Sequence, residues 1–400
     1  MIMNCNKKIL KFLIFIFFVS SILVFFSIIS CQVRAQQIAA PDNKSFVNGV
    51  FPVPRPENLS PLGLPPIPSD NPQTKDKIDL GRILFFDPRL SGNATISCAS
   101  CHLPQMGWGF TDTLSMGYPG TVHWRNSQTL INSAYYKKLF WDGSSLSLER
   151  QAASAAKGAV AGNGESDMME ARLAFVPEYR ARFEKVFGDS WPSIGNAWNA
   201  IASFERTLVQ RDTAFDRFMA GDDTALSKSA QRGLVLFSGK AGCISCHRGP
   251  LLSDEKYYNI GVPSSWLWNE DSLAQITFRY ELLAKGVTEP LYRRAKGDPG
   301  YYFVTKQKTD LGKFRTPSLR YSKYTAPYMH NGAFATLDDV IDFYNVGGGI
   351  GAFAENKTKL VKPLGLNGEE KKDLKAFLLS LSGEPLTIEY PDIPPMAPLP

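Results

Sequence analysis

The chain has 400 residues, 44% of them hydrophobic and 20% charged, which is the composition of a globular protein rather than of a disordered one. Its formal net charge is +6, but residues 1–35 hold four basic residues and no acid, so 40 basic and 38 acidic residues remain after them. This near balance gives no electrostatic reason to expect a nucleic-acid partner.

The N-terminus has the layout of a bacterial export signal. Lysines precede an apolar run from Phe12 to Ile29, and small residues follow near Cys31. We therefore expect residues 1–35 to direct the chain to the periplasm. The residues before Cys31 are typical of a lipoprotein processing box, residues 33–35 suit ordinary cleavage equally well, and the run is also near the length of about 20 residues that spans a bilayer. Membrane contact is expected only through this N-terminal lipid or anchor.

Two proline-rich stretches flank the central part of the chain. Residues 36–75 carry nine prolines and are expected to form an extended tether, or a strap over the surface, without a core of their own. Residues 385–400 are expected to form an extended tail. Ordered structure should begin near Asp76, where "DKIDLGRILFF" predicts a short apolar helix.

Four cysteines lie outside the export segment, in two matching motifs. These are "CASCH" (Cys98, Cys101, His102) and "CISCH" (Cys243, Cys246, His247). An exported protein can use cysteines in disulfides, but a two-residue gap with a trailing histidine is the pattern of c-type haem attachment. Zinc pairs normally recur without a histidine directly after each one. The sequence therefore predicts two covalent c-type haems, each with its iron held from one side by a histidine.

A weak internal repeat surrounds these motifs, because "KSAQRGLVLFSGKAGCISCH" resembles the stretch from Asp76 to His102. It predicts a mainly α-helical fold with two cytochrome c-like domains, residues 76–220 and 221–384, each with one haem.

Apolar residues at helical spacing support this fold class. They run from Trp198 to Leu208, and Asn367 with Glu370 predicts a capped helix. Residues 253–313 are aromatic without a clear period and are expected to be loop-like.

The second ligand of each iron decides the chemistry. A haem with both faces filled by strong ligands suits electron transfer, whereas an open face can bind peroxide or oxygen. Besides the two motif histidines, the chain offers His123 and His330, and methionines near the motifs in sequence are Met106, Met116 and Met329.

A capped helix near residue 340 carries a further candidate ligand. Thr336 with Asp339 forms a capping pattern, and the apolar stripe that follows ends in Tyr344. Tyr344 therefore faces inward, where most tyrosines merely pack and hydrogen-bond.

The chain resembles the bacterial di-haem cytochrome c peroxidases and the MauG enzymes. The resemblance runs from about Asp76 to Gly383 and is based on the two haem motifs, "WRNSQTLINSAYYKKLFWDGSSLSLERQA", "GKFRTPSLRYSKYTAPYMHNG" and "TLDDVIDFY". In the peroxidases a methionine closes the second haem, and the matching position here is Tyr344. The resemblance thus implies the MauG-like branch, with tyrosine on the second iron and Met329 as the competing ligand. A phenolate lowers the potential of the iron, while methionine raises it.

The resemblance also implies how the first haem works. Tyr118 stands where those peroxidases of the family that need reductive activation carry a blocking histidine, so the iron held by His102 should be open. His123 is close enough in sequence to replace that ligand, but it is better interpreted as a satisfied surface or propionate-binding histidine. Gln151 matches the distal glutamine. The distal glutamate position is taken by Ala161, and the nearest acid is Glu165, with Asp167 and Glu170 as alternatives.

Further matches concern the region between the haems. Trp141 matches the tryptophan that passes oxidising equivalents between them, although a buried tryptophan alone is usually core. Asn126, Thr325 and Pro327 match a calcium site, whose oxygen ligands suit that hard cation. Arg315 and Arg320 are candidates for the propionates of the second haem, or are surface charges.

These expectations lead to three functional hypotheses. The first is an oxidoreductase that uses hydrogen peroxide at the first haem and, like MauG, oxidises a protein partner by hole transfer through Trp141 and the Tyr344-ligated haem. The second is a cytochrome c peroxidase that takes electrons from a small redox protein. The third is a di-haem electron carrier without catalysis.

Overall fold

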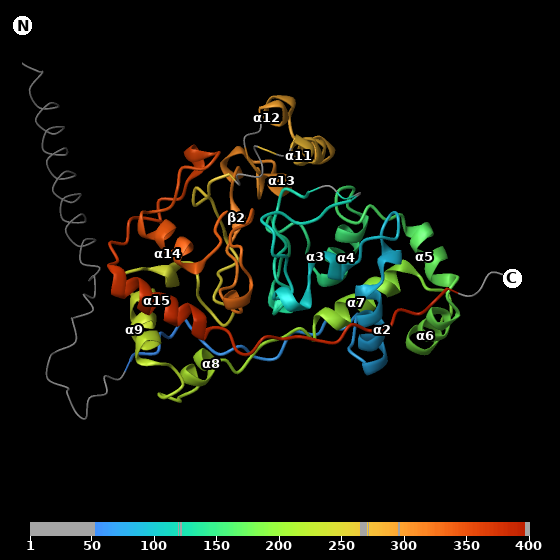
Figure 1. Ribbon diagram of the computed structural model, residues 1–400, viewed down its shortest axis with the longest axis horizontal. Helices are drawn as coiled ribbons and strands as arrows, with labels where there is room; N and C mark the ends of the chain where they lie inside the picture. Colours follow the sequence, from blue (N-terminus) through green and yellow to red (C-terminus); the bar gives the residue numbers. More distant parts are fainter. Residues whose placement is uncertain are drawn as a thin grey trace, which may run out of the picture. The chain divides into compact units, whose positions relative to one another are not determined.

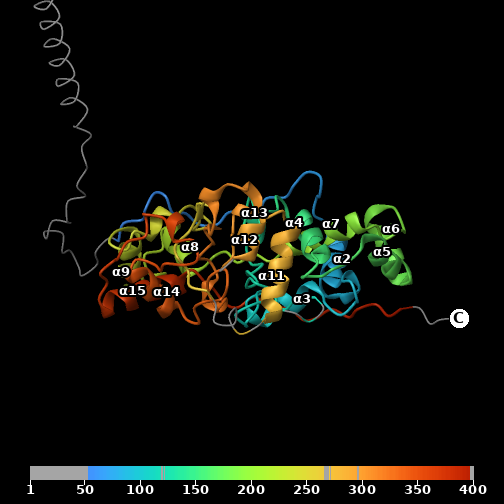
Figure 2. The ribbon, with the colours of Figure 1, turned by 90° about the horizontal axis from the view of Figure 1, so that it is seen from above.

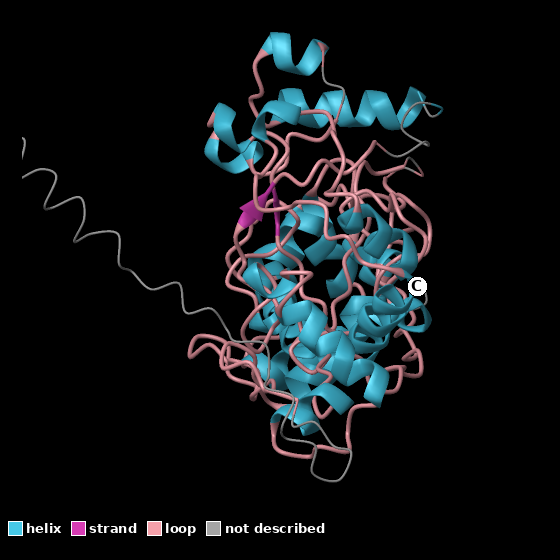
Figure 3. Ribbon diagram, turned by 90° about the vertical axis from the view of Figure 1, so that its left-hand side faces the viewer, coloured by secondary structure: helices cyan, strands magenta, loops and turns pink. Residues whose placement is uncertain are grey.

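A computed structural model describes residues 53–118, 120, 122–264, 270, 272–294 and 297–396. The predicted export signal lies outside these residues, as do the first part of the proline-rich segment and the end of the tail. The described residues form helices and loops with one short strand pair (Figure 3). The predicted fold class, mainly α, is confirmed.

The elements follow in chain order. The α-helices are α2 (Lys75–Phe86), α3 (Cys98–Cys101), α4 (Leu148–Lys157), α5 (Ser166–Ala174), α6 (Pro177–Phe187), α7 (Ile194–Glu205), α8 (Ala214–Met219), α9 (Lys228–Ser238), α11 (Ser272–Ala284), α12 (Glu289–Arg293), α13 (Tyr302–Thr305), α14 (Leu337–Asn345) and α15 (Gly368–Ser380). Single 3-10 turns are η1 (Pro88–Leu90), η2 (Pro104–Met106), η3 (Ser133–Tyr135), η4 (Cys243–Ser245), η5 (Lys308–Asp310), η6 (Ser322–Tyr324) and η7 (Ala354–Asn356). Strands β1 (Tyr257–Tyr258) and β2 (Phe314–Arg315) are antiparallel, with Tyr257 opposite Arg315.

Each haem motif is preceded by a helix that packs closely against a second helix of the chain, and the contact is made at a glycine. A Cβ on Gly81 of α2 would lie 1.8 Å from the Ala200 carbonyl oxygen of α7, and one on Gly233 of α9 would lie 2.0 Å from the Asp373 carbonyl oxygen of α15. Only glycine allows such close approach of two helix backbones. The two glycines occupy equivalent places in the repeat, which therefore encodes the same helix contact twice.

Two hydrophobic clusters surround these helix contacts. The first includes Leu80, Phe85 and Phe204, and the second includes Phe237 and Phe377. Figure 1 shows α2 with α7 at one end of the described unit and α9 with α15 at the other. Residues from Val53 onward form one compact unit, and the division into domains 76–220 and 221–384 stays a prediction.

Both proline-rich stretches contact these clusters. Leu59 is buried in the second cluster, so the expectation that residues 36–75 contribute no core is wrong there. The segment is a strap whose backbone finds partners: the Leu62 N–H donates to Asp216 and the Asn58 carbonyl accepts from Gly249. Along the tail, the Leu386 carbonyl accepts from the Trp108 indole. Exposed proline-rich backbone thus becomes ordered by hydrogen bonds to the folded part.

Residues 253–313 are less loop-like than expected, because α11 lies within them (Figure 2). This helix buries Phe278 and Leu282 against Trp124. Its outer face also carries apolar residues, including Ile276 and Tyr280, which are exposed. Because both faces of α11 carry apolar residues, the sequence shows no clear helical period there. Across the described part of the chain, no helix has the length and apolar character needed to cross a membrane.

Candidate functional site

A cavity of about 820 Å³ lies between the two haem motifs and is lined by residues of both. This is near the upper end of the range of about 300–1,000 Å³ for small-molecule sites. Its walls include every predicted site residue except Glu165. They are Cys98, Cys101, His102, Asn126, Trp141, Gln151, Cys243, Cys246, His247, Arg315, Thr325, Pro327 and Tyr344.

The two motif histidines have the tautomer that an iron ligand requires. His102 Nδ1 is 3.2 Å from the Trp108 carbonyl oxygen, and His247 Nδ1 is 3.0 Å from that of Leu252. A carbonyl only accepts, so each Nδ1 carries the proton and each Nε2 keeps a lone pair. Burial lowers the pKa of both imidazoles, which keeps them neutral. The four described cysteines form no disulfide. These residues fit two c-type haems.

His123 has the opposite tautomer. The Arg125 backbone N–H donates to His123 Nδ1 over 3.0 Å, so the ring proton must be on Nε2. Burial, followed by the charges of Arg125 and Lys285, lowers its pKa to about 3. Its ring stacks on Trp124 at 3.9 Å. A neutral histidine with a protonated Nε2 offers that atom no lone pair for iron, which supports the interpretation of His123 as a satisfied histidine. It lines the cavity, so the alternative of a surface position is wrong.

Tyr344 lies on the inner face of α14. The predicted capping box of Thr336 and Asp339 begins this helix. Burial raises the pKa of the Tyr344 hydroxyl, and the nearby thiols of Cys243 and Cys246 raise it further. Tyr344 is therefore next to the second haem motif, and its phenol stays protonated unless a cation displaces the proton. Met329 also lines the cavity, so ligation by Tyr344 stays a prediction.

Of the residues predicted to assist at the first haem, Gln151 lines the cavity and the candidate acids do not. Gln151 projects from α4 into the cavity wall. Glu165 is exposed where α5 begins and does not line the cavity, nor do Asp167 and Glu170. The Glu170 carboxylate accepts from the Trp191 indole and the Ile194 N–H. The structure thus brings Gln151 to the site but none of the three candidate acids.

Trp141 is fixed on the wall of the cavity between the two halves. Its indole N–H donates to the Asn126 carbonyl over 2.9 Å, and its own carbonyl accepts from the Arg315 N–H over 2.9 Å. The ring centroid is 6.4 Å from that of His330, edge to face. The position suits a relay between the haems, a role that stays a prediction.

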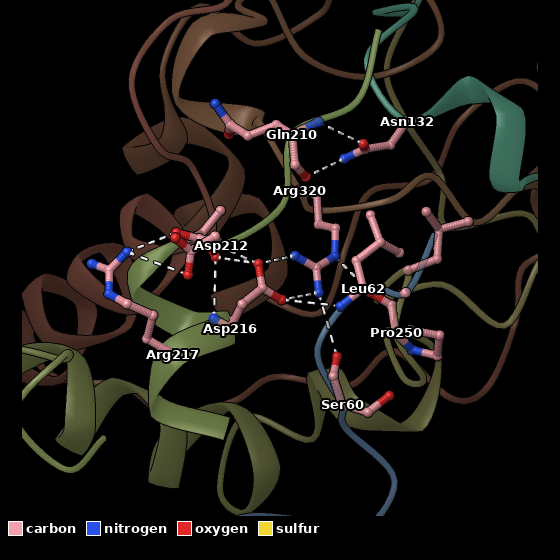
Figure 4. Close-up of polar contacts among 12 residues, drawn as sticks. Ser60, Leu62, Asn132, Gln210, Asp212, Asp216, Arg217, Pro250 and Arg320 are labelled. Carbon is pink, nitrogen blue, oxygen red and sulfur yellow. Dashed lines mark hydrogen bonds and ion pairs between the residues drawn. The ribbon is translucent and has the colours of Figure 1, made fainter. Parts of the chain in front are cut away.

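Arg315 and Arg320 differ in how their donors are used. Arg315 is buried and its Nη1 has no hydrogen-bond partner, while Nη2 reaches Gln128 at 3.3 Å. A buried guanidinium with one unpaired N–H group on a cavity wall fits an anion such as a haem propionate. Arg320 is also buried, but it forms a bidentate ion pair with Asp216 (Figure 4). Arg320 is therefore no surface charge; it lines the cavity with its guanidinium held by Asp216.

The candidate calcium ligands share the same wall. Asn126 donates its amide N–H to the Asp112 carbonyl over 3.0 Å, which leaves its side-chain oxygen available as an acceptor. Thr325 and Pro327 line the cavity with it. Amide and carbonyl oxygens are suitable calcium ligands. The residues fit this cation, whose binding stays a prediction.

Sequence reasoning missed Glu205, the last residue of α7. It is 3% exposed, lines the cavity near Cys98, and its Oε2 has no partner. Burial raises its pKa to about 8; Arg206 lowers it and Glu149 raises it. The signal was present: Glu205 stands four residues after Ile201 and three before Leu208, on the inner stripe of the helix.

Glu205 is expected to make stability fall as pH rises. Below the ordinary glutamate pKa of 4.5, Glu205 is protonated in both the folded and the unfolded protein. Between pH 4.5 and about 8 it is protonated only in the folded protein, so unfolding releases a proton and becomes more favourable as the pH rises. Each tenfold difference in proton affinity is worth about 1.4 kcal/mol. The variant Glu205→Gln should therefore raise the melting temperature clearly near pH 8 and much less near pH 5, as followed by circular dichroism. The exposed Glu165→Gln serves as the control, and an equal gain at both pH values would contradict the prediction.

Comparison with known proteins adds relatives over most of the chain. The family model described as di-haem cytochrome c peroxidase matches residues 75–225. Cytochrome-c peroxidase IdrP1 of Denitromonas iodatirespirans is 57% identical over 84% of this chain and 89% of its own. Methylamine utilization protein MauG of Methylorubrum extorquens is 34% identical over 85% of this chain and 86% of its own. The crystal structure of a MauG-like protein associated with microbial copper homeostasis has a TM-score of 0.69 at 30% identity, over 84% of this chain and 97% of that one.

Proposed function

The chain belongs to the di-haem cytochrome c peroxidase family and is a peroxidase-type oxidoreductase with two haems, and from this premise we propose that it reduces hydrogen peroxide at the first haem with electrons delivered through the second. The observation that carries the proposal is the cavity that both haem motifs line, with Gln151 and Trp141 on its walls. The name of the relative at 57% identity supports this reading, which was the second hypothesis from the sequence.

The residues divide the work as follows. The cysteines of each motif would hold a haem covalently, and His102 and His247 would bind the two irons through Nε2. The haems would supply the electron-transfer chemistry. Gln151 would orient peroxide by hydrogen bonding, and His123 would not ligate the first iron, because its Nε2 carries a proton. Arg315 would bind a propionate with its unpaired Nη1, and Trp141 would carry charge between the two haems.

A MauG-like reaction on a protein partner is the second candidate. Tyr344 favours it, because a phenolate on the second iron would lower the potential of that haem and make it harder to reduce by a mild donor. Relatives of both names match this chain over most of its length. Steady-state turnover with a reduced small redox protein separates the two candidates, since a fast donor-dependent reaction supports the peroxidase.

We place the mature protein in the periplasm, following the export signal of residues 1–35, with lipid attachment at Cys31 as one mode of retention. Calcium bound by Asn126, Thr325 and Pro327 would fasten the segment after α3 to the loop before α14. Chelation is then expected to lower the melting temperature of the holoprotein.

A peroxide titration of the oxidised holoprotein tests the function. We expect the resting spectrum to combine high-spin and low-spin haem, because only one iron is open, and we expect it to change with one equivalent of peroxide without prior reduction. Gln151→Leu should slow this change, since positioned groups typically supply about 10² to 10⁴ in rate. A wholly low-spin spectrum that does not respond to peroxide would leave only the electron carrier.

A further inference from the structure

A stacked pair of tyrosines lies directly behind the cavity wall. The rings of Tyr257, on β1, and Tyr301, just before α13, have centroids 3.7 Å apart and planes 9° from parallel. Neither residue lines the cavity. Aromatic pairs that merely pack prefer offset or edge-to-face arrangements with centroids about 4.5–7 Å apart. Such close face-to-face overlap couples the two π-systems, so that an electron can pass from one ring to the other.

Backbone contacts connect the pair to Trp141. Tyr257 is opposite Arg315 in the strand register, and the Arg315 N–H donates to the Trp141 carbonyl. Arg315 therefore lies between Tyr257 on one side and the turn of Trp141 on the other, which puts the backbone of Tyr257 roughly 10 Å, about two interstrand spacings, from that of Trp141. The turn after Trp141 makes room for the phenol: a Cβ on Gly143 would lie 1.7 Å from the Tyr257 hydroxyl oxygen.

The two hydroxyl groups differ. That of Tyr257 is buried and has no hydrogen-bond partner, so no protein group can take its proton. The Tyr301 hydroxyl is not among the buried groups without a partner, and it forms no hydrogen bond to a described residue. Its proton can therefore leave to solvent. The Lys138 ammonium lies 6.0 Å from the Tyr257 ring and 5.8 Å from the Tyr301 ring. This positive charge disfavours a cationic ring, so loss of an electron must be accompanied by loss of a proton.

We propose that Tyr257 and Tyr301 form a redox-active pair through which oxidising equivalents leave the cavity for the surface. This rests on the proposed function, since hydrogen peroxide is the oxidant. Peroxide takes up two electrons and two protons to give two waters. Tyr301 would supply one of these electrons through Tyr257 and Trp141 and release its phenolic proton to solvent, and the haems would supply the other electron. The neutral tyrosyl radical is then reduced by an external one-electron donor, with a proton from solvent.

Electron paramagnetic resonance tests the pair. Holoprotein mixed with hydrogen peroxide in the absence of a donor is freeze-quenched, and an organic radical is identified as tyrosyl by the narrowing of its signal with ring-deuterated tyrosine. We expect the signal in the wild type, most of it lost in Tyr301→Phe, and a smaller yield in Tyr257→Phe. Tyr280→Phe, which removes an exposed hydroxyl outside the pair, should keep it. Spin trapping with peptide mass analysis should place the adduct on Tyr301.

The haem absorbance of the same samples separates the two proposals. If peroxide changes this absorbance and Tyr301→Phe keeps the wild-type radical yield, the pair is not the outlet and the proposed function stands. If the absorbance does not respond to peroxide, the pair and the proposed function are both overturned. Because each variant keeps the ring, unchanged melting temperatures would exclude misfolding as the cause of a lost signal.

Discussion

Tyr344→Met should raise the reduction potential of the second haem by about 0.1 V or more, within the range of about 0.8 V that axial ligands control. A phenolate is anionic and stabilises oxidised iron, whereas a thioether is neutral and favours the reduced state. The position supports this role, since Tyr344 faces the cavity near Cys243 and Cys246. The same change should make the second haem easier to reduce by a mild donor and so increase donor-dependent peroxidase turnover.

Spectroelectrochemical titration of both haems measures this effect. Tyr328→Phe is the matched control, because Tyr328 also lines the cavity but its hydroxyl donates to the Ser322 carbonyl over 2.9 Å. Its potentials should equal those of the wild type. Met329→Leu decides between the competing ligands. If Tyr344→Met leaves the second potential unchanged while Met329→Leu alters it, Met329 is the ligand.

Local chemistry explains which parts of the fold were predictable. The haem motifs need no tertiary information, since thioether formation fixes the spacing of the cysteines and histidine. The capping boxes before α14 and α15 were also correct, because a cap is completed within four residues. The helices α7 and α15 were also predicted, but their close contacts with α2 and α9 at Gly81 and Gly233 were not, because the partners are distant in sequence.

Predictions that depended on long-range placement were less successful. Glu165 was chosen by counting along a loop, and the loop places it in solvent rather than in the cavity. The helix α11 was missed because its outer face is as apolar as its buried one. Glu205 was passed over because acidic residues usually face solvent, although its place on the inner stripe of α7 argued otherwise. The tautomers of His102 and His123 depend on backbone groups that no sequence pattern reveals.

Arg125 lines the cavity and holds two buried carboxylates. Its Nη1 is 2.8 Å from Asp142, next to Trp141, and its Nε is 2.5 Å from Asp298; all three side chains are at most 8% exposed. Burial would raise the pKa of Asp142, but the charges of Arg125 and Lys285 outweigh it and lower the pKa to about 2. The ion-pair cluster therefore fixes the Trp141 turn and the segment that leads to Tyr301.

Arg125→Met should destabilise the protein by about 3–5 kcal/mol near neutral pH, because it removes the ion-pair partner of two buried carboxylates. Denaturant unfolding of the holoprotein measures this loss. The control Arg182→Met removes an exposed ion pair with Glu178 and should cost about 0–1 kcal/mol. The loss should shrink as pH falls toward about 4, since the uncompensated carboxylates then bind protons. The native protein meanwhile loses the contribution of Asp142 as pH falls from 3.8 toward 2. A loss that is equal at neutral pH and at pH 4, or no larger than in the control, would mean that the ion pairs of Arg125 do not stabilise the fold.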